Sequence, residues 1–159
     1  MISEREGDLL DQTDLEFIAH QANLRHTFGA GIAIQIARRY PYSMAADAAT
    51  EYDDKKKLGT YSICVSPDGK GPNVVNLYSQ NGMGPGSTDY AALRLALTRL
   101  EDFMRPSARV ARLGLPYRLG CGLAGGSWPK VYGIIHDVFD KSPVDVVIVT
   151  RPQDVEDAQ

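Results

Sequence analysis

Apolar residues follow two different periods along this chain, and the two periods alternate. A helical period, with apolar side chains three to four positions apart, marks three segments: 32–40, 90–104 and 128–139. Short runs rich in β-branched and other apolar residues predict five strands: 16–21, 61–65, 74–78, 108–117 and 144–149. The alternation predicts an α/β protein in which helices cover both sides of one sheet.

Local signals refine this pattern. The connection 66–72 between two of the strands is short and rich in turn residues, so we expect that pair to be antiparallel and the sheet to be mixed. Thr88 is expected to cap the helix 90–104. The polar segment 42–58, which ends in three lysines before Gly59, is expected to form a surface helix.

Length and composition limit what the chain can be. With 159 residues, 43% of them hydrophobic, we expect one domain over residues 1–152 and a polar, acidic tail over 153–159. The formal net charge of −3 offers no general attraction for nucleic acid or an anionic membrane. The chain has no membrane-spanning apolar run, and its charged first residues do not resemble a signal peptide. We expect a cytoplasmic protein that does not bind membranes, and a monomer.

The cysteines and histidines point to no metal site and no disulfide. Cys64 and Cys121 are expected to be free thiols, as is usual in a reducing compartment. His20 and His26 lack a nearby carboxylate or cysteine pattern, so we expect neither a metal site nor a cofactor.

Two glycine-rich segments stand immediately before predicted helices: loop 1, residues 29–33, and loop 2, residues 120–126. The first turn of a helix has unpaired N–H groups and a partial positive charge, and glycine lets backbone amides approach an anion closely. Two such loops suit the two phosphates of a diphosphate. The alternative is that the glycines only relieve steric crowding in a strand-to-helix turn.

Loop 2 also matches the pattern G-x-G-x-x-G of dinucleotide-binding Rossmann folds. That pattern belongs in the first strand-helix unit with an acidic residue after the next strand, whereas here one strand remains and it ends at Thr150 and Arg151. A third glycine-rich segment, 82–87, lacks the lysine of a phosphate-binding P-loop. We therefore expect diphosphate binding without either topology.

Five segments in a fixed order resemble a known family. They are Gly-Asp-Leu-Leu at 7–10, Ala-His-Gln-Ala-Asn at 19–23, loop 1, Val-Asn-Leu-Tyr-Ser-Gln at 75–80, and loop 2 with Ser127 and Trp128. Over essentially the whole chain they resemble a macrodomain, in particular the branch of terminal ADP-ribose protein glycohydrolases and ADP-ribose-1″-phosphate phosphatases. The resemblance implies a three-layer α/β/α fold with a mixed, mostly parallel sheet and ADP-ribose in a cleft at one sheet edge.

The resemblance also implies ligand-binding roles. Asp8 matches the carboxylate that accepts a hydrogen bond from the adenine amino group, and otherwise would be a turn or cap residue. Asn23 matches the asparagine that meets the distal ribose, and otherwise would be a loop residue. Loop 1 would cover the distal ribose and one phosphate, loop 2 would wrap the diphosphate, and Trp128 would close the cleft wall unless it belongs to the core. The ligand-binding residues expected on this basis are Asp8, Leu9, Asn23, Gly29, Ala30, Gly31, Ile32, Ser79, Gln80, Gly120, Cys121, Gly122, Leu123, Ala124, Gly125, Gly126 and Trp128.

The catalytic groups of the family's glycohydrolases are missing from this chain. Those enzymes use a lysine near the end of the strand that matches 75–80 and an aspartate directly after Gly-Cys-Gly-Leu, where this chain has Gln80 and Ala124. Neither side chain can form a Schiff base or take a proton. We expect a hydrolase that removes ADP-ribose from modified acidic side chains, in which Asn23, Gln80 or loop backbone holds the attacking water and a substrate phosphate oxygen assists.

Other chemistries stay open at this stage. The amide-rich surroundings of Cys121 are expected to lower the pKa of its thiol, which would permit a nucleophilic role in place of packing. Hydrolysis of ADP-ribose-1″-phosphate and binding of ADP-ribose without turnover are the alternative functions. The expected partners are ADP-ribose and ADP-ribosylated protein, and nucleic acid only if it carries ADP-ribose.

Overall fold

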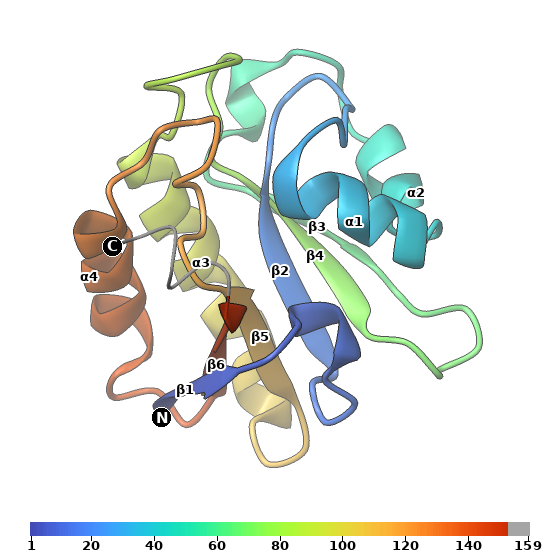
Figure 1. The fold of residues 1–159 in the computed structure, drawn as a ribbon, viewed down its shortest axis with the longest axis vertical. Coiled ribbons are helices and arrows are strands. Elements are labelled where there is room, and N and C mark those ends of the chain that lie inside the picture. The colour runs from blue at the N-terminus through green and yellow to red at the C-terminus, as the bar shows by residue number, and fades with distance from the viewer. Residues whose placement is uncertain (153–159) are drawn as a thin grey trace.

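A six-stranded sheet forms the middle layer of this computed structural model, which describes residues 1–152 (Figure 1). The strands are β1 Ile2–Glu6, β2 Phe17–Ala22, β3 Tyr61–Cys64, β4 Asn73–Tyr78, β5 Arg112–Pro116 and β6 Asp145–Thr150. Their order is β1-β6-β5-β2-β4-β3, and only the β3–β4 pair is antiparallel. The mixed, mostly parallel sheet is thus confirmed, whereas the tail predicted at 153–159 lies outside the described residues.

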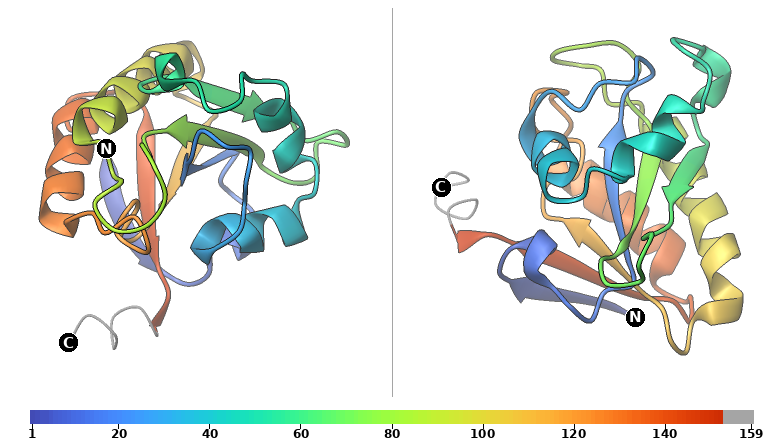
Figure 2. Two further views of the ribbon diagram at one scale, coloured as in Figure 1. Left: turned by 90° about the horizontal axis from the view of Figure 1, so that it is seen from above. Right: turned by 90° about the vertical axis from the view of Figure 1, so that its right-hand side faces the viewer.

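Helices cover both faces of the sheet, as Figure 2 shows from above. The helices are α1 Gly31–Arg39 and α2 Ser43–Ala48 on one face, and α3 Tyr90–Met104 and α4 Trp128–Phe139 on the other. Three short 3-10 turns are Leu9–Asp11, Lys55–Lys57 and Arg105–Ser107. No helix within residues 1–152 is both long enough and apolar enough to cross a membrane.

The hydrophobic patterns that predict these layers are the ones that become buried. Leu93, Leu97 and Leu100 lie on one face of α3 and are fully buried in the larger core. β6 is buried on both sides, because Ile148 faces this core while Val147 faces the smaller core beneath α1. Burying each such side chain contributes roughly 1.5–3 kcal/mol.

The predicted helix 42–58 is wrong in extent. α2 ends at Ala48, and Lys55–Lys57 form a 3-10 turn. Asp53 lies between them with a φ of 51°, which a helix does not permit, and its N–H donates to the carbonyl of Leu24 at 2.7 Å. A tertiary contact therefore interrupts the segment, and the buried Asp47 shows that α2 is not wholly a surface helix.

Three further features differ from the prediction: the strand β1, the cap of α3 and the start of β5. β1 has no hydrophobic run because it is a short, charged edge strand that pairs only with β6. Asp89 caps α3 by accepting from Ala92 N at 2.9 Å, whereas Thr88 Oγ1 donates to the carbonyl of Gly120 in loop 2. β5 is shorter than predicted because residues 108–110 form turns that follow the 3-10 turn Arg105–Ser107, so the strand begins only at Arg112.

The strand order brings three glycine-rich loops together. β2 lies between β4 and β5 and is parallel to both. The segments that follow β2, β4 and β5 therefore leave the sheet at the same edge, and Figure 1 shows them gathered at the top of the molecule. In open sheets with parallel strands, ligands bind at this carboxyl edge.

Candidate functional site

A cavity of about 710 Å³ opens at the carboxyl edge of the sheet. Its volume is in the range of small-molecule sites, roughly 300–1,000 Å³. Loop 1 and loop 2 line it together with residues after β4, and the predicted residues that reach it are Asp8, Leu9, Asn23, Gly29, Ala30, Gly31, Ile32, Gln80, Gly120, Cys121, Gly122, Leu123 and Ala124. Thirteen of the seventeen predicted ligand-binding residues therefore line this cavity.

Loop 1 presents the start of α1 to the cavity. Ala30 is the N-cap in an extended conformation, and no side chain caps the helix. The first turn holds no acidic residue, so no carboxylate within it competes for the positive end of the helix. The N–H groups of this turn have no partner within the helix and are available to an anion.

Loop 2 folds on itself in a way that leaves its middle amides unused. The N–H of Gly125 donates to the carbonyl of Gly122 at 2.9 Å, and the N–H of Gly126 donates to that of Gly120 at 2.9 Å. The N–H groups of Gly122, Leu123 and Ala124 make no hydrogen bond with any of residues 1–152. A Cβ on Gly122 would meet no atom within 4 Å, so this part of the loop borders open space.

Neighbouring elements hold loop 2 in this shape. The N–H of Ser87 donates to the carbonyl of Ala124 at 3.0 Å, which joins loop 2 to the glycine-rich segment after β4. A Cβ on Gly120 would lie 2.8 Å from Gln21 Oε1, and one on Gly126 would lie 2.5 Å from the carbonyl oxygen of Gly120. These two glycines are needed for close approach, whereas Gly122 is not.

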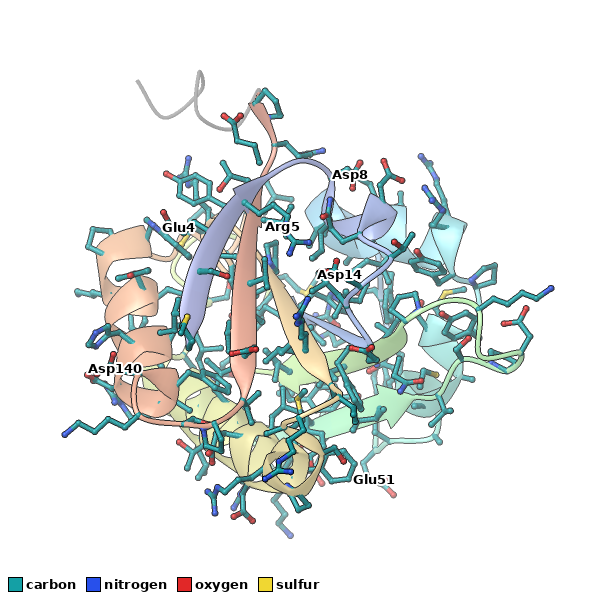
Figure 3. All side chains as sticks on the ribbon, turned by 90° about the horizontal axis from the view of Figure 1, so that it is seen from below. Glu4, Arg5, Asp8, Asp14, Glu51 and Asp140 are labelled. Carbon is teal, nitrogen blue, oxygen red and sulfur yellow. The ribbon has the colours of Figure 1, made fainter. Side chains whose placement is uncertain are left out.

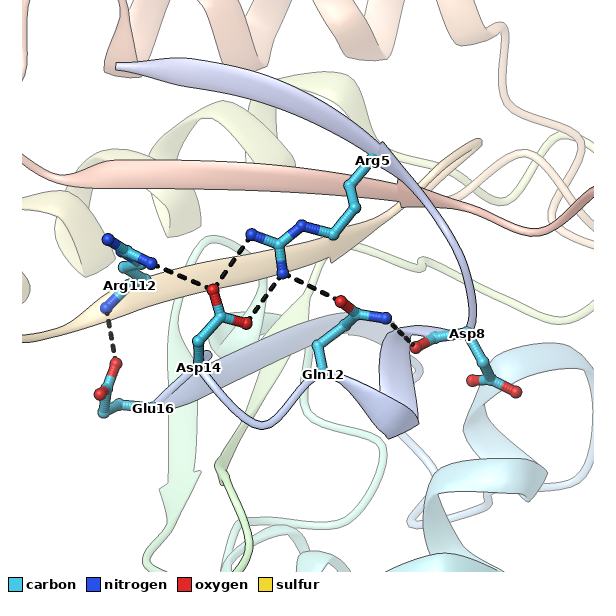
Figure 4. A network of polar contacts seen from close by, with 6 residues as sticks. All are labelled: Arg5, Asp8, Gln12, Asp14, Glu16 and Arg112. Carbon is cyan, nitrogen blue, oxygen red and sulfur yellow. Dashed lines mark hydrogen bonds and ion pairs between the residues drawn. The ribbon is translucent and has the colours of Figure 1, made fainter.

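Asp8 follows β1, and β6, β5 and β2 lie between β1 and β4 in the sheet, so Asp8 and the segment after β4 belong to distant strands. Its Oδ1 accepts from the N–H of Leu10 at 2.9 Å and caps the turn Leu9–Asp11, which confirms the interpretation of Asp8 as a cap. The same residue lines the cavity. Figure 4 shows its carboxylate pointing away from the neighbouring polar network, and its Oδ2 makes no hydrogen bond with any of residues 1–152, so capping leaves one carboxylate oxygen for a ligand.

A polar network fixes the backbone of Asp8 from behind (Figure 4). Arg5 donates to both carboxylate oxygens of Asp14 at 2.8 and 3.0 Å and to Gln12 Oε1 at 2.9 Å. Gln12 Nε2 then donates to the carbonyl of Asp8 at 2.9 Å. Figure 3 shows Arg5 and Asp14 side by side, with Asp8 further on beside α1. The hydrogen bonds from Arg5 lower the pKa of Asp14 from 3.8 to about 2.

Asn23 uses its side chain to fold its own loop. Its Nδ2 donates to the carbonyl of Thr27 at 3.0 Å and to Thr27 Oγ1 at 2.8 Å, and its Oδ1 accepts from the N–H of Arg25 at 2.9 Å. Asn23 lines the cavity as predicted, yet its polar atoms are already engaged. Its action on a ribose hydroxyl or a water stays a prediction.

Five predicted ligand residues differ in how close they come to the cavity. Gln80 lines it, with its Nε2 donating to the carbonyl of Gly82 at 3.1 Å. Ser79, Gly125, Gly126 and Trp128 do not line it. Trp128 instead packs behind a lining residue, with its ring 5.0 Å from that of Tyr117, which supports the core interpretation.

The expected pKa of Cys121 is wrong in direction. Burial raises the pKa of this thiol and outweighs the opposing charge of Arg118. Its Sγ donates to the carbonyl of Leu119 at 3.3 Å, and the side chain is almost fully buried. Cys121 therefore serves packing, and both cysteines are free, as predicted.

The two histidines near loop 1 have structural partners. His20 is fully buried, its Nε2 lies 2.7 Å from Asn76 Oδ1, and burial lowers its pKa. Its ring packs 5.3 Å from that of Phe28, directly before loop 1. His26 lies 3.3 Å from Thr50 Oγ1, and neither histidine lines the cavity. No group of three or more metal-ligating side chains occurs among residues 1–152.

Several lining residues were not predicted. One is Thr27, which holds the side chain of Asn23. Two others, Tyr117 and Arg118, stand shortly before loop 2, and Arg151 follows β6. Their closeness to the glycine loops in the sequence was the available signal for Tyr117 and Arg118. Within residues 1–152, the lining contains one carboxylate, that of Asp8, and neither a histidine nor a lysine.

Comparisons with known proteins were made for both sequence and structure. No protein-family profile matches the chain. An uncharacterised 17.5 kDa protein from the tk–vs intergenic region of Enterobacteria phage T4 is 34% identical over 134 residues, which are 83% of this chain and 84% of the phage protein. The macrodomain of Mycobacterium tuberculosis DarG is 26% identical, with a TM-score of 0.76, over 94% of this chain and 97% of its own. Thermosipho africanus DarTG in complex with ADP-ribose is 16% identical, with a TM-score of 0.73, over 97% of this chain and 44% of its own.

Proposed function

Because this chain has the macrodomain fold and belongs to the same family as the phage T4 protein, we propose that it binds ADP-ribose between loop 1 and loop 2. As a finer proposal, it hydrolyses the ester between ADP-ribose and acidic side chains of modified proteins, in the cytoplasm. The Thermosipho africanus protein of the same fold was solved with ADP-ribose, and this supports the choice of ligand.

One observation carries the binding proposal: unpaired amides from two loops face one cavity. The first turn of α1 offers N–H groups to one phosphate, and Gly122, Leu123 and Ala124 offer theirs to the other. Such charge-assisted hydrogen bonds are shorter and stronger than neutral ones. Asp8, which also lines the cavity, is an acceptor for the amino group of adenine.

The choice of an ester linkage follows from the side chains around the cavity. Among residues 1–152, no histidine or lysine lines the cavity, and its one carboxylate, that of Asp8, follows β1, which β6, β5 and β2 separate from β4. The described lining therefore offers no imidazolium, ammonium or carboxylic acid near Gln80 to protonate a poor leaving group. A carboxylate leaves without protonation. Water adds its oxygen to the anomeric carbon, the bond from that carbon to the carboxylate oxygen breaks, the carboxylate keeps the electron pair, and the extra proton of the water passes to solvent.

Gln80 is the side chain proposed to hold this water. Its amide is exposed at the cavity and makes one hydrogen bond, to the carbonyl of Gly82, whereas Asn23 is occupied by Thr27 and Arg25. The role of Asn23 is then to shape the loop beside the distal ribose. The same scarcity of acid and base groups favours a second function, in which the chain binds ADP-ribosylated protein without turnover.

One assay separates these functions. The protein is incubated with glutamate-linked ADP-ribosylated protein, with arginine-linked ADP-ribosylated protein and with ADP-ribose-1″-phosphate, and the release of ADP-ribose and of phosphate is followed. The proposal expects ADP-ribose from the glutamate-linked substrate alone. Phosphate release would identify a phosphatase instead, and binding without any product would identify a reader.

A further inference from the structure

Arg118 has a backbone conformation that its side chain does not favour. Its φ is 64°, in the left-handed region that glycine adopts freely and residues with a Cβ avoid. Two other non-glycine residues within residues 1–152 share this feature, His26 and Asp53, and both types are enriched there. Arginine has no such preference, so its presence at this position calls for a cause.

The tight turn between β5 and loop 2 imposes this conformation. The N–H of Leu119 donates to the carbonyl of Pro116 at 3.1 Å, and the N–H of Cys121 donates to that of Arg118 at 2.8 Å. The turn delivers the chain from the buried strand into the glycine loop. Glycine at 118 would make the same two bonds without strain, because both involve only backbone atoms.

The side chain of Arg118 has no task within the described protein. It is exposed and lines the cavity, and its guanidinium makes no hydrogen bond or ion pair with any of residues 1–152. By contrast, four other arginines pair with carboxylates at 2.8–3.0 Å: Arg5, Arg39, Arg94 and Arg112. The charge of Arg118 does reach loop 2, where it opposes the effect of burial on the pKa of Cys121.

We propose that Arg118 is a ligand-binding residue whose guanidinium contacts the diphosphate of ADP-ribose, and that the strained backbone is retained for this contact. The proposal rests on the proposed function, since it takes ADP-ribose as the ligand. The planar fork of a guanidinium matches two phosphate oxygens, and the diphosphate would give Arg118 the anionic partner that it lacks among residues 1–152. Loop amides and Arg118 would then hold the same group from two sides.

Arg118→Gly separates binding from folding. Glycine removes the guanidinium and also the strain, so we expect a melting temperature equal to or above that of the unaltered protein, together with a dissociation constant for ADP-ribose raised about 10- to 100-fold. The affinity of the variant should also depend less on salt, because one phosphate contact by a cation is lost. Isothermal titration calorimetry at low and high salt, about 50 and about 300 mM NaCl, measures both effects.

Two further variants complete the test. Arg109→Gly removes an exposed arginine before β5, at the other end of that strand, and should leave the affinity unchanged. Arg118→Gln keeps a long side chain but removes the charge. If the glycine variant folds poorly, the dissociation constant of this glutamine variant tests the contact with the diphosphate. An unchanged dissociation constant in a folded Gly or Gln variant overturns the inference, whereas failure of the unaltered protein to bind ADP-ribose overturns the proposed function itself.

Discussion

Replacing Gly122 by valine tests the loop 2 amides with little disturbance to the fold. Gly122 is not in the left-handed region, and an added Cβ would meet no atom within 4 Å. We therefore expect the free energy of unfolding to change by no more than about 0.5 kcal/mol. The new side chain would stand in the open space where the diphosphate is proposed to lie.

The loss of affinity follows from the hydrogen bonds that the valine blocks. If two of the three free amides in loop 2 can no longer reach a phosphate, the cost is about 1.5–3 kcal/mol for each charge-assisted bond. The sum of about 3–6 kcal/mol corresponds to a dissociation constant raised roughly 10²- to 10⁴-fold. Such a change takes micromolar binding to the limit of detection.

Calorimetric titration with ADP-ribose and urea unfolding of the same samples provide the two readings. Gly133→Ala is the matched control, because Gly133 lies inside α4, away from the cavity, and its Cβ also meets open space. It should raise stability by up to about 1 kcal/mol and leave binding unchanged. Undiminished binding by a folded Gly122→Val protein would refute the placement of the diphosphate on loop 2.

Three further predictions address the surroundings of the ligand. Gln12→Glu keeps the acceptor for Arg5 but loses the donor to the Asp8 carbonyl. The preference of this variant for ADP-ribose over the hypoxanthine analogue should therefore fall several-fold, and an unchanged ratio of the two dissociation constants would exclude a role for Gln12 in positioning Asp8. Asp14 has a pKa of about 2 in the folded chain against an ordinary 3.8, so the stability it contributes is complete above about pH 4 and is lost as the pH falls toward 2. The melting temperature of Asp14→Asn should therefore decline less than that of the unaltered chain over this pH range. Parallel curves of melting temperature against pH would contradict this role of Asp14. Asn23→Ala removes both bonds to Thr27, so urea unfolding should show a loss of about 1–3 kcal/mol and turnover should fall while ADP-ribose binding stays measurable, whereas full activity would remove Asn23 from the mechanism.

The fold was predictable where buried positions produce a periodic pattern of apolar residues in the sequence. The apolar faces of α3 and α4 and the doubly buried β6 were recognised because each hydrophobic position in them contacts the core. β1 was missed because a charged edge strand has no such mark. The segment 42–58 was misjudged because the N–H of Asp53 bonds to Leu24, a residue outside any window that a helical pattern covers.

The site was predictable to the extent that backbone chemistry defines it. Glycines before helices predict unpaired backbone amides, and loop 1 and loop 2 both bring such amides to the lining of the cavity. Side-chain roles depend on neighbours distant in the sequence. The pKa of the Cys121 thiol follows from burial under other elements, and the lack of a partner for Arg118 among residues 1–152 is visible only once those residues have positions.

An NMR titration of the amide-labelled protein with ADP-ribose tests the central claim most directly, since it reports binding and its location together. We expect saturable shifts of the amide signals of residues 31–33 and 122–124, with the signal of Gly133 in α4 unmoved. Absence of shifts, or shifts confined to residues outside the cavity, would contradict the assignment of loop 1 and loop 2 as the diphosphate site.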